Sequence, residues 1–207
     1  MTLKNKAALQ YMLPLLLTYV ATVAAVSSGQ RPEWIDLARA ALPATGMLVL
    51  CHLMQDLLPK SIKEFLVFLR FRARLPGHRA FTQYCRDDPR VPETYIRETL
   101  NEIGGSARAQ NAHWYLLYRD VSKEPLIEHE NLRYLAWRDT TATLCLLTLA
   151  TPMLPFFEFL LMHQAINISL ACAGAAVLTS IAARNAAYSL VKNVVAFASG
   201  STASPME

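Results

Sequence analysis

Long stretches without charged side chains constrain the fold of this chain most strongly. No charged residue occurs from Ala7 to Val26, and Glu158 is the only one from Thr140 to Ala183. An apolar stretch of about 18 residues or more can cross the roughly 30 Å hydrocarbon layer as a helix. Lipid offers no hydrogen-bond partners to the backbone, so such stretches must be helical. The sequence, with its 53% apolar residues, therefore predicts an all-α integral membrane protein.

Prolines and turn residues divide the uncharged regions into four transmembrane helices that form two hairpins. The predicted spans are Ala7 to Val26, about Ala40 to Leu58, Thr140 to the prolines at 152 and 155, and about Ala165 to Ala183. No Pro or Gly follows the fourth span directly, so its helix is expected to continue beyond the membrane. The predicted segments are a first hairpin at 1–59, a cytoplasmic insert at 60–139, a second hairpin with its helical extension at 140–198, and a disordered tail at 199–207.

The insert between the hairpins is predicted to be helical, because no alternating β pattern of useful length occurs in it. Its expected helices are Ser61 to Arg70, Pro92 to Ile103, Gln110 to Asp120 and Glu128 to Arg138. The second has a proline in its first turn, which helices tolerate there. Gly104 and Gly105 follow it and are expected to end it.

Basic residues lie mainly on one side of the predicted spans. Of the 20 Lys and Arg residues, two precede the first span, fourteen lie between Lys60 and Arg138, and two follow the last span. Positive charge is retained on the cytoplasmic side during insertion, so both termini and the insert are predicted to be cytoplasmic. Lys4 and Lys6 before an apolar stretch also suit a signal peptide, but this stretch is long for one, and we expect an uncleaved anchor.

The stretch FLRFRARLPGHR, from Phe68 to Arg79, combines positive charge with apolar residues just after the second span. One interpretation is a juxtamembrane segment whose arginines contact anionic headgroups, each contributing about 1 kcal/mol. Another is a site for a phosphate-bearing ligand, since Arg donates paired hydrogen bonds to phosphate. On a helix, Arg70 and Arg74 would share a face, with Arg72 displaced from it.

The choice of arginine favours the ligand interpretation, although it does not exclude the other. The region from Lys60 to Arg138 has eleven Arg and three Lys, together with aromatic residues on which bases could stack. The ten acidic residues there weaken the case, because many arginines could pair with them. The predicted ligand-binding residues are Arg70, Arg72, Arg74, His78, Arg79, Arg86 and Trp114. The ligand would be an anionic nucleotide or single-stranded nucleic acid.

Polar residues within or beside the spans are candidates for a pore lining or a subunit interface. His52 and Asp56 are four residues apart and share a helix face, with Gln55 beside them. Ionisable groups at membrane depth are costly and usually face protein or water. Glu158 could form a carboxylate ring at the outer mouth. Solvation is the simpler interpretation of both acidic residues, with Asp56 at the membrane interface and Glu158 in a loop.

Enzyme and metal-site signatures are absent from the sequence. It has no GxSxG, HExxH, Walker A or GxGxxG motif. The four cysteines lack CxxC spacing and are interpreted as small apolar core residues. We therefore expect no catalytic residues, no bound metal and no cofactor.

The arrangement as a whole resembles small four-span membrane proteins of bacterial anti-phage defence systems. The resemblance rests on the lysine-bearing N-terminus, the hairpin from Ala7 to Leu58, the insert with RFRARLPGHRAF and NAHWYLLYRD, and the second hairpin. Membrane subunits of the Hailong and Kiwa type are examples. It implies a homo-oligomer in the bacterial inner membrane, with a tetramer favoured. That oligomer would be a channel-like effector gated through its basic region, or a non-conducting sensor or scaffold that recruits a cytoplasmic protein partner.

Overall fold

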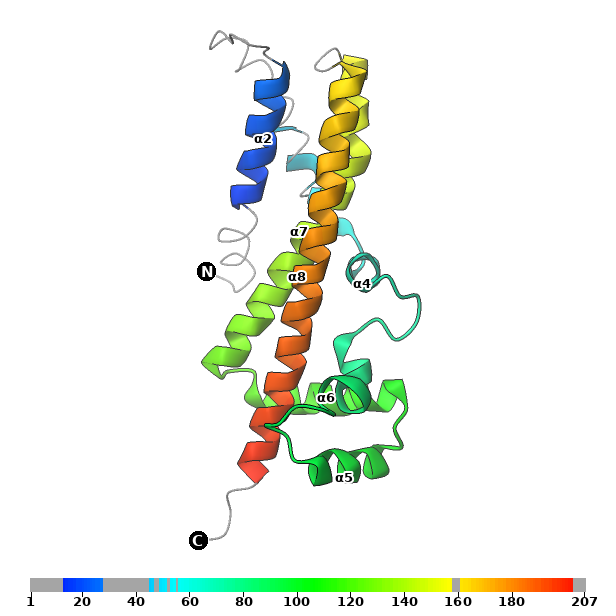
Figure 1. Ribbon diagram of the computed structural model, residues 1–207, viewed down its shortest axis with the longest axis vertical. Coiled ribbons are helices and arrows are strands. Elements are labelled where there is room, and N and C mark those ends of the chain that lie inside the picture. The colour runs from blue at the N-terminus through cyan, green and yellow to red at the C-terminus, as the bar shows by residue number, and fades with distance from the viewer. Residues whose placement is uncertain are drawn as a thin grey trace. The chain divides into compact units, whose positions relative to one another are not determined.

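The described chain is built entirely of helices and the loops between them (Figure 1). The computed structural model describes residues 13–27, 45–46, 49–51, 53–54, 56–157 and 161–202, and no strand occurs among them. The predicted all-α class is therefore confirmed for this part of the chain. The elements are α2 (Leu13–Ser27), α4 (Lys60–Phe68), η2 (Pro76–Arg79), η3 (Ala80–Tyr84), α5 (Glu93–Ile103), α6 (Ala107–Val121), α7 (Pro125–Ala150), η4 (Thr151–Phe157) and α8 (Met162–Thr202).

The helices predicted in the insert are present as α4, α5, α6 and the first half of α7, with one correction. Helix α4 ends at Phe68, so the expectation that Arg70 belongs to a helix is wrong. Leu69 and Ala73 have φ angles of 51° and 49°, in the left-handed region, which is incompatible with a continuing right-handed helix. Helix α5 ends as predicted, at Gly104, whose φ of 74° suits a residue without a Cβ atom.

One helix in the described residues is long and apolar enough to cross a membrane. It is α8, whose segment Met162–Gly200 reaches a mean hydropathy of 1.8. The predicted helical continuation beyond Ala183 is confirmed, because α8 runs without a break to Thr202. It thereby enters the segment predicted to be a disordered tail, and that prediction is wrong for the residues up to Thr202. The first two predicted spans fall partly outside the described residues, and α7 gives way at Thr151 to the short η4 before the third predicted span is complete.

The chain divides into two compact units. The first unit comprises Met1–Val67 and Leu135–Ile181, and the second comprises Phe68–Tyr134 and Ala182–Glu207. Helices α7 and α8 each supply residues to both. The boundaries of these units differ from those of the predicted segments. Most of α4 and the residues from Leu135 to Asp139 belong to the first unit, although they were predicted to lie in the insert. The part of α8 from Ala182 onward belongs to the same unit as most of the insert.

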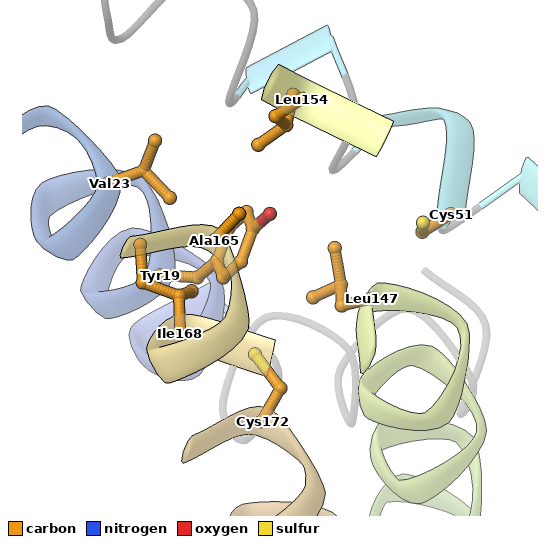
Figure 2. Packing of buried hydrophobic residues seen from close by; sticks show 8 residues of the cluster. All are labelled: Tyr19, Val23, Cys51, Leu147, Leu154, Ala165, Ile168 and Cys172. Carbon is orange, nitrogen blue, oxygen red and sulfur yellow. The ribbon is translucent and has the colours of Figure 1, made fainter. Parts of the chain in front are cut away.

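The core of the first unit lies between α2, the end of α7, η4 and the first half of α8. Figure 2 shows the buried side chains Tyr19, Val23, Cys51, Leu147, Leu154, Ala165, Ile168 and Cys172 directed toward one another. Hydroxyl groups supplement this packing. The hydroxyls of Tyr19 and Thr151 lie 3.0 Å apart, and Thr141 donates to Thr179 over 3.0 Å, which joins α7 to α8. Hydrogen bonds of this kind commonly join helices in membrane proteins.

The surface of the first unit is apolar, while many of its buried residues are polar. Exposed apolar side chains occur on every described part of it, among them Leu57, Leu149, Phe156, Leu170 and Leu178. Buried polar or charged residues include Lys63, Glu64, Arg138, Asp139, Thr140, Thr141, Thr143, Thr179 and Ser180. The four charged residues are buried as ion pairs, as buried charges in proteins usually are, so the exposed apolar side chains are the feature that distinguishes this unit.

The second unit has the distribution of a soluble domain. Its core contains Phe81, Val91, Ile96, Val191 and Val195, so η3, α5 and the end of α8 share one apolar cluster. Charged residues such as Arg72, Arg86, Glu98 and Glu102 are exposed. Among the described residues, the second unit exposes fewer large apolar side chains than the first, and Leu69, Phe71 and Tyr115 are among those that it does expose.

Candidate anion-binding site

The three arginines at 70, 72 and 74 lie in a loop, residues 69–75, that joins α4 to η2. Arg70 Nη1 lies 3.5 Å from the Tyr84 hydroxyl, and Arg74 Nε donates to the carbonyl oxygen of Phe71 over 3.1 Å. Arg72 is exposed and forms no hydrogen bond or ion pair with any described residue. Two of the three guanidinium groups therefore help to hold the loop, and Arg72 is available to an external anion.

The predicted residues in η2 and α6 make contacts within the second unit. Gly77 packs so closely against α6 that a Cβ atom on it would lie 2.7 Å from Asn111 Oδ1 and 2.9 Å from Trp114 Cε3. The Trp114 ring in turn stacks on Tyr118, with 5.5 Å between ring centroids. His78 Nδ1 lies 3.1 Å from the Leu75 carbonyl oxygen, and Arg79 Nη1 donates to Gln83 Oε1 over 3.2 Å.

Gln110 of α6 fixes the start of η3, a role that the sequence did not suggest. Its side chain is buried, and its Oε1 accepts hydrogen bonds from the backbone N–H groups of Phe81 and Thr82 at 3.3 and 3.2 Å and from the Thr82 hydroxyl at 3.2 Å. Its Nε2 donates to the Gly105 carbonyl oxygen over 2.8 Å. One amide thus joins η3, α6 and the turn after α5.

A cavity of about 540 Å³ opens between η3 and α5 in the second unit. This volume is in the range of small-molecule sites, roughly 300–1,000 Å³. It is lined by Phe81, Thr82, Arg86, Asp87, Glu93, Ile96, Arg97 and Leu100. Of the seven predicted ligand-binding residues, Arg86 is the one that lines it. The structure therefore separates Arg86 from the loop arginines with which it was grouped.

The charges around this cavity favour a ligand with both anionic and hydrogen-donating groups. Arg86 forms no hydrogen bond or ion pair with the described residues, whereas Arg97 Nη2 donates to Glu93 Oε1 over 2.8 Å at an exposed position. Guanidinium groups bind phosphate or carboxylate, and the carboxylates of Asp87 and Glu93 accept from hydroxyl or amino groups. Ile96 and Leu100 give the same cavity an apolar wall.

The loop that follows the cavity contains an ion pair and is joined to α8 by a hydrogen bond. Arg90 donates through Nε and Nη2 to the two carboxylate oxygens of Asp88, at 3.0 and 2.8 Å, and through Nη1 to Asn193 Oδ1 at 2.7 Å. The hydrogen bonds from Arg90 hold the pKa of the Asp88 carboxyl below its usual value. Asp88 therefore stays ionised at neutral pH, and Arg90 is engaged in structure rather than available to a ligand.

The predicted pore or interface residues are mostly outside the described part of the chain. His52, Gln55 and Glu158 belong to residues that the structure does not describe, and Asp56 is exposed. The proposed roles of these four residues stay predictions.

A buried cluster of four charged residues in the first unit was missed by the sequence analysis. Lys63, Glu64, Arg138 and Asp139 retain only 5%, 2%, 8% and 5% of their accessible surface. Lys63 Nζ lies 3.2 Å from Asp139 Oδ1, Arg138 Nη2 lies 2.9 Å from the same oxygen, and Arg138 Nη1 lies 3.6 Å from Glu64 Oε1. The sequence does contain a signal for this cluster. Lys63 and Glu64, and likewise Arg138 and Asp139, are adjacent residues of opposite charge beside an apolar segment.

Other polar groups give no sign of metal or disulfide chemistry in the described residues. All four cysteines are free thiols, and burial raises the pKa of Cys85 in the second unit to about 12. No group of three potential metal ligands occurs in the part of the chain that the structure describes. No protein family, no curated protein and no solved structure matches the chain.

Proposed function

We propose that this protein is an integral membrane protein whose first unit lies in the bilayer and whose second unit binds an anionic ligand on the cytoplasmic side. The observation that carries the proposal is the concentration of exposed large apolar side chains on the first unit, which the second unit shows to a lesser extent. Large exposed apolar surfaces indicate contact with a membrane or another protein. Here they extend over helices that also carry the long uncharged stretches.

The finer arrangement that we propose has four transmembrane helices and both termini in the cytoplasm. Helix α8 meets the requirement for a membrane span by length and composition, and the distribution of Lys and Arg supports the orientation. The small size of a four-helix bundle supports a homo-oligomer, with a tetramer favoured, if the protein conducts. The bacterial inner membrane and a role in anti-phage defence follow only from the resemblance in layout and are proposed on that basis.

The proposed ligand site is the cavity lined by Arg86 and Arg97. Its mixture of arginines, carboxylates and apolar side chains suits a nucleotide or a short single strand, which combine phosphate, hydroxyl groups and a flat base. Helix α8 offers a route for the signal, because Val191 and Val195 belong to the core of the second unit while Ala165 and Ile168 belong to that of the first. A ligand that binds one packing of the second unit more tightly would shift the state of this shared helix.

Binding and flux measurements on the purified full-length protein test this proposal. We expect ATP or a short single-stranded DNA to bind with an affinity that falls as salt rises. Arg86→Ala should weaken binding by about tenfold or more, because a charge-assisted hydrogen bond contributes about 1.5–3 kcal/mol. Arg108→Ala is the matched control, since Arg108 is also exposed and forms no hydrogen bond or ion pair with the described residues but lies outside the cavity.

Two results would contradict the proposal at different points. If the Arg86 and Arg108 substitutions changed the ligand affinity equally, the cavity would be excluded as the ligand site. If liposomes that contain the protein conduct no ions, with or without ligand, the channel-like function would be excluded, whereas the proposal for the ligand site would be unaffected.

A second candidate function is a scaffold that recruits a cytoplasmic protein. It is favoured by the exposed side chains of Tyr115 and Leu116 on α6, which lie about one helical turn before the exposed charges of Arg119 and Asp120. Exposed aromatic residues are common at protein interfaces. A protein that does not conduct, but loses a partner in vivo on Tyr115→Ser substitution, would support this function over the first.

A further inference from the structure

The loop of residues 69–75 presents apolar and basic side chains together. Leu69 and Phe71 are 64% and 78% exposed, although the unit to which they belong buries the nearby Phe68 and Phe81. They alternate in sequence with Arg70, Arg72 and Arg74. Neighbouring large apolar side chains that are exposed together and flanked by charged ones are one mark of an interaction surface.

Contacts at both ends of the loop and within it hold residues 69–75 in this exposed conformation. Phe68 before it is buried and packs near Tyr188, with 6.4 Å between ring centroids, and Pro76 and Gly77 after it are buried. Within the loop, Arg74 Nε donates to the Phe71 carbonyl oxygen over 3.1 Å. Leu69 and Ala73 adopt left-handed backbone conformations, which are strained for residues with a Cβ atom. Strained backbone is retained mainly where it positions a functional group.

An anionic bilayer surface is the occupant that suits this loop best. Aromatic and aliphatic side chains insert between lipid headgroups while neighbouring arginines bind the phosphates. The chain supports this choice, because the loop begins directly after Phe68, at the end of a helix whose residues Lys60–Val67 belong to the apolar first unit. A protein partner would satisfy the apolar side chains equally well, but the net positive charge of the loop complements an anionic lipid surface.

We propose that residues 69–75 form an interfacial anchor, in which Leu69 and Phe71 insert into an anionic bilayer surface and Arg72 binds a lipid phosphate. The anchor is distinct from the cavity at Arg86 and does not depend on any soluble ligand. It rests on the proposed membrane location of the first unit. It assigns the arginine-rich stretch to lipid rather than to a nucleotide.

Photo-crosslinking on the full-length protein tests the anchor. A benzophenone amino acid is placed at position 71 or, as the matched control, at position 115, which is another exposed aromatic position of the second unit. The protein is reconstituted in vesicles of phosphatidylcholine alone or with phosphatidylglycerol, irradiated, and examined for adducts by mass spectrometry. Membrane location itself is measured separately, as resistance to extraction by alkaline carbonate.

The expected result is lipid adducts at position 71 in the anionic vesicles, several-fold above those at position 115. Arg72→Gln should lower the adducts about fivefold in anionic vesicles, since each basic residue near the surface contributes about that factor. Equal adducts at the two positions, or adducts of position 71 with a second copy of the chain, would overturn the anchor. Carbonate extraction of the unmodified protein would instead overturn the proposed membrane location, so the two failures are distinguishable.

Discussion

At the scale of single residues, Gln110 joins three parts of the second unit through its side-chain amide. Its side-chain oxygen accepts three hydrogen bonds from Phe81 and Thr82, at the point where η2 meets η3. This junction places Phe81 in the core and Thr82 at the rim of the cavity. The sequence contains no signal for this role, because a glutamine on a helix is most often solvated and its partners lie about thirty residues earlier in the chain.

Replacing Gln110 with alanine should open the second unit locally. The buried N–H group of Phe81 would lose its acceptor, which costs about 1–3 kcal/mol, and the partly buried N–H group of Thr82 would lose the same acceptor at a smaller cost. The measurement is the rate of Cys85 alkylation, because this buried thiol, with its pKa of about 12, reacts only when the unit opens. Gln83→Ala is the control, since Gln83 is exposed and accepts one hydrogen bond, from Arg79. Equal alkylation rates in the two variants would refute the role given to Gln110.

At the scale of elements, the pairing of α4 with α7 depends on the buried charges of Lys63, Glu64, Arg138 and Asp139. Asp139 Oδ1 accepts from both Lys63 and Arg138, while Arg138 also faces Glu64. The cluster is neutral as a whole, which limits the cost of burying it. The contact between α4 and α7 therefore depends on equal numbers of buried positive and negative charges, because removal of one leaves another uncompensated.

Asp139→Leu should be strongly destabilising, and adding Lys63→Met should restore much of the loss. The single substitution leaves Lys63 buried without its carboxylate, and an uncompensated buried charge costs about 3–5 kcal/mol. The double substitution removes both charges of that pair and keeps Arg138 with Glu64. Thermal melting in detergent measures the effect, with Glu93→Gln as a control that breaks an exposed pair and costs under about 1 kcal/mol. A double variant that is less stable than the single one would contradict this account.

The helices of this protein were easier to predict from sequence than the contacts between them. Pro92 and Gly104 predicted the two ends of α5, and the uncharged residues of the fourth predicted span indicated α8. These signals could be interpreted from sequence because each acts within one segment. The end of α4 at Phe68 was missed, since nothing in the residues Leu69 and Ala73 favours a left-handed conformation. The placement of Arg86 at a cavity, and of Arg70 beside Tyr84, depends on tertiary packing that a single sequence does not specify.

At the scale of the whole molecule, the surfaces of the two units and the distribution of basic residues lead to one orientation in the membrane. The first unit has the apolar exterior that lipid requires, and fourteen of the 20 Lys and Arg residues lie between Lys60 and Arg138. Moving that many charges across a bilayer is unfavourable, and insertion retains them in the cytoplasm. The second unit is therefore placed on the cytoplasmic side in our proposal, and the connection between the first two spans on the other.

Labelling of single introduced cysteines with a membrane-impermeant charged maleimide tests this orientation. Lys123→Cys lies in the exposed turn between α6 and α7 and should react in inverted vesicles but not in intact spheroplasts. Gln30→Cys, in the predicted connection between the first two spans, should show the reverse. Cys51, Cys85 and Cys172 are buried and Cys145 is half-buried, so their background labelling should be low in the native protein. Reaction of both positions from the same side would exclude the predicted hairpin, because a chain that crosses the bilayer once between positions 30 and 123 must place them on opposite sides.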